Sequence, residues 1–362
     1  MRKDEKSLQK KFRPVEFLIE QFIKSVSFIS FAVIILIFLF VFREALPIFS
    51  PKEKVEVKEQ LQAESYGEEP TVQLQQSTNK LENNNALNDK ATASNLLGKE
   101  WQPVGEVPKY GLLPLFVGSL KVTIISLIIA SPIAILAAIF SSLFAPKKLR
   151  EIIKPAIELL SSFPSVVIGF FALVTLATFL QNIFGYTFRL NSFVGGLAMA
   201  ISVIPIIYTF TEDALTAVPK YFSEASLALG ANKWQTALFV IMPAATPGIF
   251  AALILGFGRA FGETMIVLIA TGNAPLSTIN IFDPVRTLSA TIGAEMAEVV
   301  FGDVHYSVLF FIGSLLFIIT FILNAVAEFY VRAKLMKRFR GEWWIIKFLV
   351  NQLSLLRYWQ HQ

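Results

Sequence analysis

The sequence predicts an all-α polytopic membrane protein with six transmembrane helices. Hydrophobic residues make up 54% of the chain and charged residues only 16%, with a mean hydropathy of +0.58. A soluble domain averages about a quarter charged residues. Six apolar runs are also long enough to cross a hydrocarbon core of about 30 Å, which takes about 20 helical residues. We place the spans at 25–46, 113–144, 157–181, 192–218, 245–271 and 305–331.

The first span is expected to be a retained helix rather than a cleaved signal peptide. The basic segment 1–24 precedes the charge-free run Val26–Phe42, which lacks a small-residue cleavage site and is long enough to span a bilayer.

A polar insertion, 47–112, separates the first span from the second. Most of it is rich in Glu, Gln, Asn, Lys and Ser and poor in aromatic residues. The run Leu74–Asn95 has too few apolar residues to form a core, so we expect a flexible, chemically inert segment. The role of 51–100 stays open.

The distribution of Lys and Arg predicts the topology. Positive charge gathers in the N-terminal segment, after the second span (Lys147, Lys148, Arg150, Lys154) and after the sixth, whereas 182–191 and 272–304 hold one Arg each. This pattern places both termini and the loop 219–243 in the cytoplasm and the insertion outside. The tail 332–362 is basic and partly amphipathic, suited either to lying along the inner membrane surface or to packing on the bundle.

The loop 219–243 looks like a docking element. Its first part is rich in helix formers around Ala225, and Glu224 is expected to be an exposed carboxylate in the first turn. Gly230 suits a left-handed turn between two short helices. Trp234 begins an apolar face with Leu238, four residues on, and Pro243 closes the segment.

Charges inside spans are rare and mark functional candidates. Arg259 and Glu263 lie four apart in the fifth span and are expected to pair across one helix face. Arg259 faces a translocation path in one interpretation, where its planar donors suit an oxyanion, and only fixes helix packing in the other. Ser119 and Thr123 are weaker candidates for the same path, since such residues often bond their own backbone.

The composition excludes several kinds of chemistry. The chain has no cysteine and two histidines, so it has no disulfide or thiolate metal site, and a histidine-based metal or catalytic site is not expected. It has no Gly-x-x-x-x-Gly-Lys-Ser/Thr phosphate loop. We therefore expect no enzyme activity and no cofactor in this chain.

Several segments resemble the permease subunits of ABC importers. The string Glu224 to Trp234, with its spacing to Pro243, is similar to the EAA signature, although Ser226 stands where that signature usually has Ala. The stretch Gly258-Arg259-Ala260-Phe261-Gly262-Glu263-Thr264-Met265 resembles the fifth span of phosphate ABC transporter permeases of the PstC type, as do Phe163–Gly169 and Phe282–Leu288. The resemblance covers about 105–340.

The resemblance implies a type I importer permease (MetI-like) fold, with a permease core at 113–331 in a bacterial inner membrane. It implies one half of a phosphate pathway, coupled through 219–243 to a separate ATPase that binds ATP and Mg. The implied partners are a PstA-like permease, two PstB-like ATPases and a PstS-like phosphate-binding protein, with membrane lipid and no nucleic acid. The alternatives left open are a permease for molybdate or sulfate, a secondary transporter or channel, and a signalling membrane protein.

Overall fold

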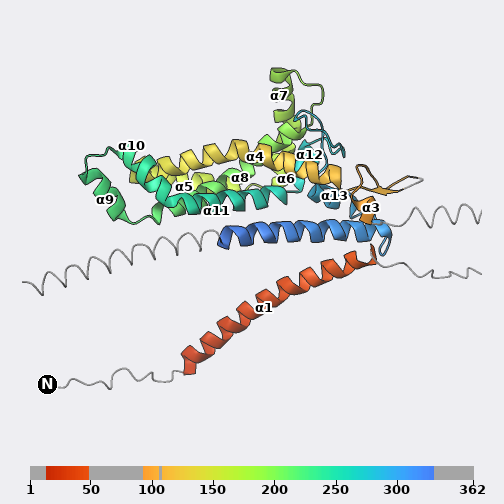
Figure 1. Cartoon of the computed structure of the whole chain (residues 1–362), viewed down its shortest axis with the longest axis horizontal. Helices are drawn as coiled ribbons and strands as arrows, with labels where there is room; N and C mark the ends of the chain where they lie inside the picture. The colour runs from red at the N-terminus through yellow and green to blue at the C-terminus, as the bar shows by residue number, and fades with distance from the viewer. Residues whose placement is uncertain (1–13, 49–92, 106–107, 330–362) are drawn as a thin grey trace, which may run out of the picture.

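The computed structural model describes residues 14–48, 93–105 and 108–329, and it is an elongated helical bundle (Figure 1). The described residues include six helices long and apolar enough to cross a membrane: Phe17–Ile48, Leu113–Phe144, Ser165–Phe184, Ser192–Thr216, Lys233–Phe261 and Val304–Phe329. The number of predicted spans is therefore confirmed, and the second, fourth and sixth spans begin and end within about two residues of the predicted bounds. The larger differences lie in the first, third and fifth spans.

Three helices form the centre of the bundle: α4 (Leu113–Ile139), α8 (Ser192–Thr216) and α11 (Met242–Phe261). Small residues let them approach closely. A Cβ on Gly196 of α8 would lie 2.5 Å from the Ile125 side chain of α4, and one on Gly256 of α11 would lie 2.7 Å from Ile207 of α8. Helix α8 is consequently the most buried of the candidate spans.

The third span begins later than its predicted start at residue 157. Helix α5 (Lys147–Ser161) is a separate amphipathic helix without a fully buried residue, and the helical structure is interrupted at Phe163-Pro164. Helix α6 (Ser165–Phe171) follows and continues through the π-helical turn η4 (Ala172–Leu176) into α7 (Ala177–Phe184), which projects from the bundle in Figure 1. Proline disfavours helical backbone in the residue before it, which accounts for the break.

The fifth span is interrupted rather than continuous over 245–271. It enters through α10 (Lys233–Thr236) and the π-helical turn η5 (Ala237–Ile241), and α11 ends at Phe261. A short helix, α12 (Met265–Ala270), then packs against α6 and α8. A loop leads to α13 (Leu288–Glu295), and the last helix runs over Val304–Phe329.

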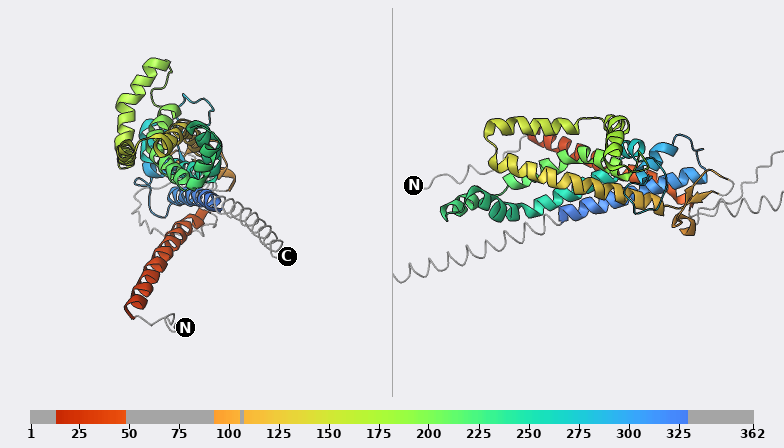
Figure 2. Two further views of the ribbon diagram at one scale, coloured as in Figure 1. Left: turned by 90° about the vertical axis from the view of Figure 1, so that its left-hand side faces the viewer. Right: turned by 90° about the horizontal axis from the view of Figure 1, so that it is seen from above.

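Helix α1 (Pro14–Ala45) begins before its predicted start at residue 25 and continues into the 3₁₀ turn η2 (Leu46–Ile48). It lies outside the central bundle and diverges from it toward the N-terminus (Figure 2). Its contacts are with the last helix, where the Phe38 and Phe317 rings lie 4.9 Å apart. Most other side chains along α1 are exposed and apolar, which suits contact with lipid, and Glu20 and Lys24 form an ion pair near its start.

A small cap closes the bundle at the end opposite α9 and α10, and we call this the hairpin end. It consists of α3 (Ala93–Leu96) and the antiparallel strands β1 (Trp101–Gln102) and β2 (Lys109–Tyr110), with Trp101 opposite Tyr110. The part of the predicted insertion after residue 92 is therefore ordered structure. The insertion from 49 to 92 and the tail from 330 to 362 lie outside the described residues.

Candidate functional site

The predicted docking loop forms two short helices joined by a tight turn. Helix α9 (Lys220–Ala228) ends in a Schellman motif: the amide of Gly230 donates to Leu227 O (3.0 Å) and the amide of Ala231 donates to Ser226 O (3.2 Å). Gly230 has a φ of 86° with no atom within 4 Å of a Cβ position. The left-handed conformation predicted for Gly230 is confirmed.

A capping box then starts α10. The Asn232 side chain accepts from the Gln235 amide at 2.9 Å, and the Gln235 side chain accepts from the Asn232 amide at the same distance. The hydroxyls of Ser226 and Thr236 lie 3.0 Å apart and join α9 to α10. The residue that departs from the EAA signature thus carries a bond between the two helices.

The residues predicted to dock lie on the surface of this end of the bundle. Glu224 and Ala225 are exposed. Glu224 was expected in the first turn of its helix, but it lies in the second turn because α9 begins at Lys220. Trp234 is 60% exposed and stacks on Phe144 at the end of the second span, with ring centroids 4.1 Å apart. Pro243 stands in the first turn of α11, where a missing amide costs little.

Arg259 and Glu263 do not form the predicted ion pair in the described structure. The pairing assumed one continuous helix, but α11 ends at Phe261 and Glu263 lies in the break before α12. Arg259 is exposed in the last turn of α11, where the helix dipole favours a cation. Within the described residues Arg259 makes no ion pair, so its guanidinium is free to bind an anion.

The break at 262–264 is held by α13. The Ser289 hydroxyl donates to the Glu263 carbonyl oxygen at 2.6 Å, and a Cβ on Gly293 would lie 2.7 Å from Thr264 Cγ2. The half-exposed Glu263 side chain is thereby placed by its backbone rather than by an ion pair.

Ser119 and Thr123 are both buried in α4. The Ser119 hydroxyl donates to Leu115 O (2.8 Å) and accepts from the Leu288 amide (2.9 Å) at the start of α13. Its hydrogen bonds therefore connect α4 with α13, and the role of these two residues in an anion path stays a prediction.

A carboxylate at the hairpin end, Glu295, joins strand β1 to the segments on either side of α13. It accepts a hydrogen bond from Trp101 Nε1 (3.1 Å), pairs with Arg286, and lies 2.9 Å from His305 Nε2. Burial raises the pKa of Glu295, but the bonds from His305 and Trp101 and the charge of Arg286 outweigh burial and lower it. Sequence reasoning did not find this cluster, because its members are separated by up to 194 residues.

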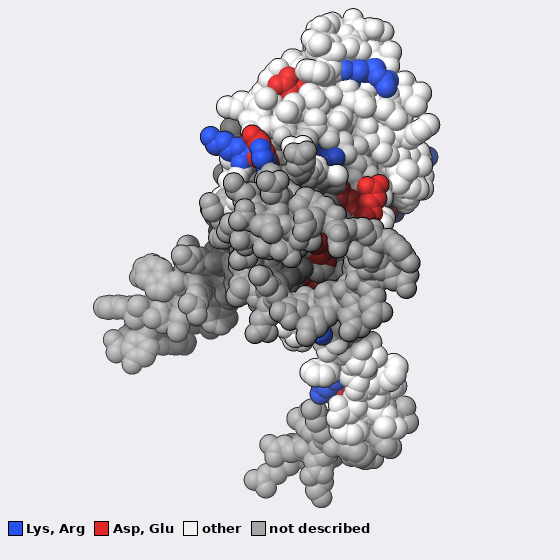
Figure 3. Space-filling model, turned by 90° about the vertical axis from the view of Figure 1, so that its right-hand side faces the viewer, with Lys and Arg blue, Asp and Glu red and all other residues white. Residues whose placement is uncertain are grey.

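Lys121 also has a structural partner. Its ammonium donates to the carbonyl oxygens of Thr278 (2.9 Å) and Asn280 (2.8 Å) in the loop before α13. Lys121 therefore fixes that loop to α4. Charged side chains are sparse on the described part of the face at this end (Figure 3).

No group of three or more His, Cys, Asp or Glu that could hold a metal ion occurs among the described residues. The prediction that ATP and Mg bind a partner rather than this chain stays a prediction.

A family model for binding-protein-dependent transport system inner membrane components matches residues 130–335. The chain belongs to this family. A probable ABC transporter permease, YqgH of Bacillus subtilis, is 36% identical over 227 residues, which cover 63% of this chain and 74% of that protein. The phosphate transport system permease proteins PstC of Mesorhizobium japonicum (33% identical, 65% and 76% covered) and PstC 1 of Mycobacterium tuberculosis (34% identical, 64% and 74% covered) are further relatives.

Among solved structures, an inward-facing form of the MetNI methionine ABC transporter is 21% identical, with a TM-score of 0.48 over 61% of this chain and 95% of that one. The family match, together with the six apolar helices, makes this chain a multi-pass inner membrane protein with the predicted all-α permease architecture. It is a transport component rather than an enzyme. Membership in this family implies an ATPase partner and a substrate-binding protein.

Proposed function

We propose that this chain is the permease subunit of an importer for inorganic phosphate and forms one half of its translocation pathway. The choice of phosphate is supported by the relatives named phosphate transport system permease proteins. The observation that carries the site assignment is Arg259, an exposed cation in the last turn of a broken spanning helix with no ion-pair partner in the described structure.

The proposed assembly contains a PstA-like permease, two PstB-like ATPases that bind ATP and Mg, and a PstS-like phosphate-binding protein. Both termini and the 219–243 loop then face the cytoplasm, and the hairpin end faces the binding protein. The exposed surface of α9 and α10, with Glu224 and Trp234, meets the ATPases. Movement of this loop on ATP binding tilts the bundle between outward- and inward-open states.

Arg259 suits a tetrahedral oxyanion, because its guanidinium presents several donors in a planar fork. The break at 262–264 places Glu263 after the helix end instead of against Arg259. A carboxylate close to the path but not bound to the cation limits how tightly an anion is held, which release requires. Binding must be strong enough for entry and weak enough for exit.

The test is phosphate uptake by proteoliposomes that hold the assembled complex. Arg259→Gln is expected to abolish uptake while the complex still assembles. The matched control is Arg43→Gln, which removes an equally exposed arginine from the last turn of α1. Uptake by Arg259→Gln near the parent rate would refute the anion-contact role. If Arg43→Gln loses as much phosphate uptake as Arg259→Gln, the loss follows from removing any exposed positive charge and not from a contact with the anion.

Substrate identity is tested separately by competition. Unlabelled phosphate is expected to suppress labelled phosphate uptake, whereas equal concentrations of sulfate or molybdate are not. Suppression by sulfate or molybdate at equal or lower concentration would replace phosphate with that oxyanion and would leave the permease assignment intact.

A further inference from the structure

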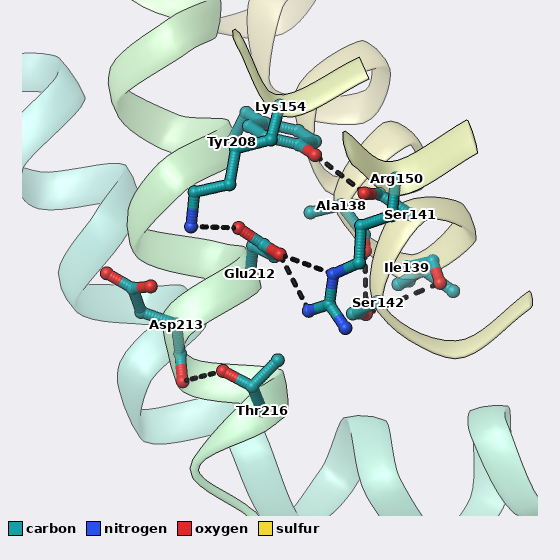
Figure 4. Close-up of polar contacts among 10 residues, drawn as sticks. All are labelled: Ala138, Ile139, Ser141, Ser142, Arg150, Lys154, Tyr208, Glu212, Asp213 and Thr216. Carbon is teal, nitrogen blue, oxygen red and sulfur yellow. Dashed lines mark hydrogen bonds and ion pairs between the residues drawn. The ribbon is translucent and has the colours of Figure 1, made fainter. Parts of the chain in front are cut away.

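A buried carboxylate lies at the α9–α10 end of the bundle, outside the proposed anion path. Glu212 stands one turn before the end of α8, and its side chain is 2% exposed. Arg150 Nε and Nη2 donate to Glu212 Oε1 at 3.0 and 2.7 Å, and Lys154 Nζ lies 2.9 Å from Oε2 (Figure 4). Oε2 has this ion pair but no hydrogen bond of good geometry.

The two cations come from one face of α5, because they are four residues apart. They reach the carboxylate from two sides in Figure 4 and keep 35% and 39% of their side chains exposed. The close pairing with the Glu212 carboxylate raises the pKa of Lys154. The group that is removed from water is thus the carboxylate, and both of its ion-pair partners among the described residues come from α5.

Apart from this ion cluster, few contacts fix the position of helix α5 on α8. None of its residues is fully buried, and only Ile153 and Ile157 pack partly against the main core. Leu159 and Ile152 remain 65% and 67% exposed. Apolar packing is non-directional, whereas the Arg150 fork fixes orientation as well as distance. The ion cluster therefore defines how α5 sits on α8.

The same turn of α8 is joined to the 219–243 loop. Tyr208, one turn before Glu212, donates to the Ser141 hydroxyl at 2.8 Å in the π-helical turn η3 (Phe140–Phe144). Phe144 in that turn stacks on Trp234 of α10. A continuous set of contacts thus leads from α10 through η3 to α8, and from α8 through Glu212 to α5. π-helical turns are frequent at functional sites.

We infer that Glu212, held by Arg150 and Lys154, is a positioning residue for energy coupling. It makes α5 and the end of α8 move as one body when the 219–243 loop is displaced, so that the displacement reaches the spans instead of being absorbed by a loose α5. The inference rests on the proposed function, since it assigns a role in transmitting the ATPase movement. It does not require Glu212 to touch the transported anion.

The central variant is Glu212→Gln in the full complex. It is isosteric and neutralises the buried partner, while the two cations keep their contact with solvent, so assembly is expected to survive. Phosphate imported per ATP hydrolysed is expected to fall about five- to tenfold, the lower end of the range of ordinary coupling energies. Arg150→Lys, which keeps the charge but loses the fork, should give a smaller loss in the same ratio. The control is Glu151→Gln, the same change at an exposed position of α5, which should leave the ratio unchanged.

A second readout needs no phosphate. Because the chain has no cysteine, spin labels at Glu158→Cys on α5 and Thr216→Cys at the end of α8 report one distance, provided that partner cysteines are removed. The parent should give one narrow distance distribution with and without ATP, and Glu212→Gln a broader one. If the parent complex imports no phosphate but Glu212→Gln still broadens the distance distribution, the proposed substrate is refuted and the positioning role of Glu212 is supported. An unchanged distribution, or unchanged coupling in both Glu212→Gln and Arg150→Lys, would overturn the inference.

Discussion

Gly118 provides the most direct test of how the second span meets the segment before α13. A Cβ at this position would lie 2.3 Å from the carbonyl oxygen of Arg286 and 3.2 Å from its carbonyl carbon. These are backbone atoms, so no rotamer change relieves the overlap. Restoring ordinary contact, about 3.5 Å between heavy atoms, requires a displacement of about 1 Å. Gly118→Ala must therefore push α4 and the Arg286 backbone apart.

The cost of this displacement can be estimated from its neighbours. Overpacking by one methyl group costs about 1–3 kcal/mol. The upper end applies here, because the same movement strains the Ser119 bond to the Leu288 amide and the Arg286 pair with Glu295. Alanine in place of glycine returns about 1 kcal/mol of helix propensity. We expect a net loss of about 2 kcal/mol in the free energy of unfolding.

The assay is a thermal melt of the purified protein in detergent, with Gly313→Ala as the matched control. A Cβ on Gly313, in the last helix, would meet nothing closer than Val41 at 3.7 Å, which is ordinary contact. Gly313→Ala should melt at or above the parent temperature and Gly118→Ala below it. A Gly118→Ala protein at least as stable as the parent would show that α4 and the Arg286 backbone are not in close contact.

Three further outcomes are expected. The pKa of Glu295 is below its ordinary value of 4.5, so the stability that this carboxylate contributes is present above about pH 4.5 and is lost as the pH falls through the lowered pKa. Glu295→Gln should therefore lower the melting temperature at pH 7 and flatten its dependence on acid pH. An equally steep acid profile in this variant would contradict the ion cluster. Gly230→Val, which strains a φ of 86°, should weaken co-purification of the ATPase at unchanged membrane abundance, and a normal yield of complex would count against docking by α9 and α10. Lys121→Met should speed hydrogen exchange at the Phe282 and Asp283 amides, which donate to Asn280 in the loop that Lys121 holds, and unchanged exchange would exclude Lys121 as the anchor of that loop.

Features that depend on neighbouring residues could be predicted from the sequence. The six spans follow from hydropathy and length, which the bilayer imposes on each helix separately. The turn at Gly230 follows from local backbone chemistry, because only a few residue types tolerate a positive φ at a helix end.

Features that depend on packing could not be predicted in the same way. The i, i+4 rule gave a pair between Arg259 and Glu263 only for an uninterrupted helix, and the break after Phe261 is held by α13, which is distant in sequence. Glu212 gave no sign of its partners, because Arg150 lies 62 residues away and a charge near a span end ordinarily reaches water. The residues that stabilise the hairpin end were equally out of reach, since Trp101 and Glu295 are paired only by the tertiary fold.

The two ends of the insertion meet at one place on the bundle. Ile48, the last described residue before it, packs against the same apolar cluster that contains Leu96 of α3, the first buried side chain after it. Because Ile48 and Leu96 pack in one cluster, the loop-closure entropy of the chain between them changes by only about 0.6 kcal/mol for each doubling of its length. We therefore expect the bundle to tolerate a change of chain length, or an added folded reporter domain, between residues 49 and 92. A deletion that extends past residue 92 would instead remove α3 and with it the closing contact.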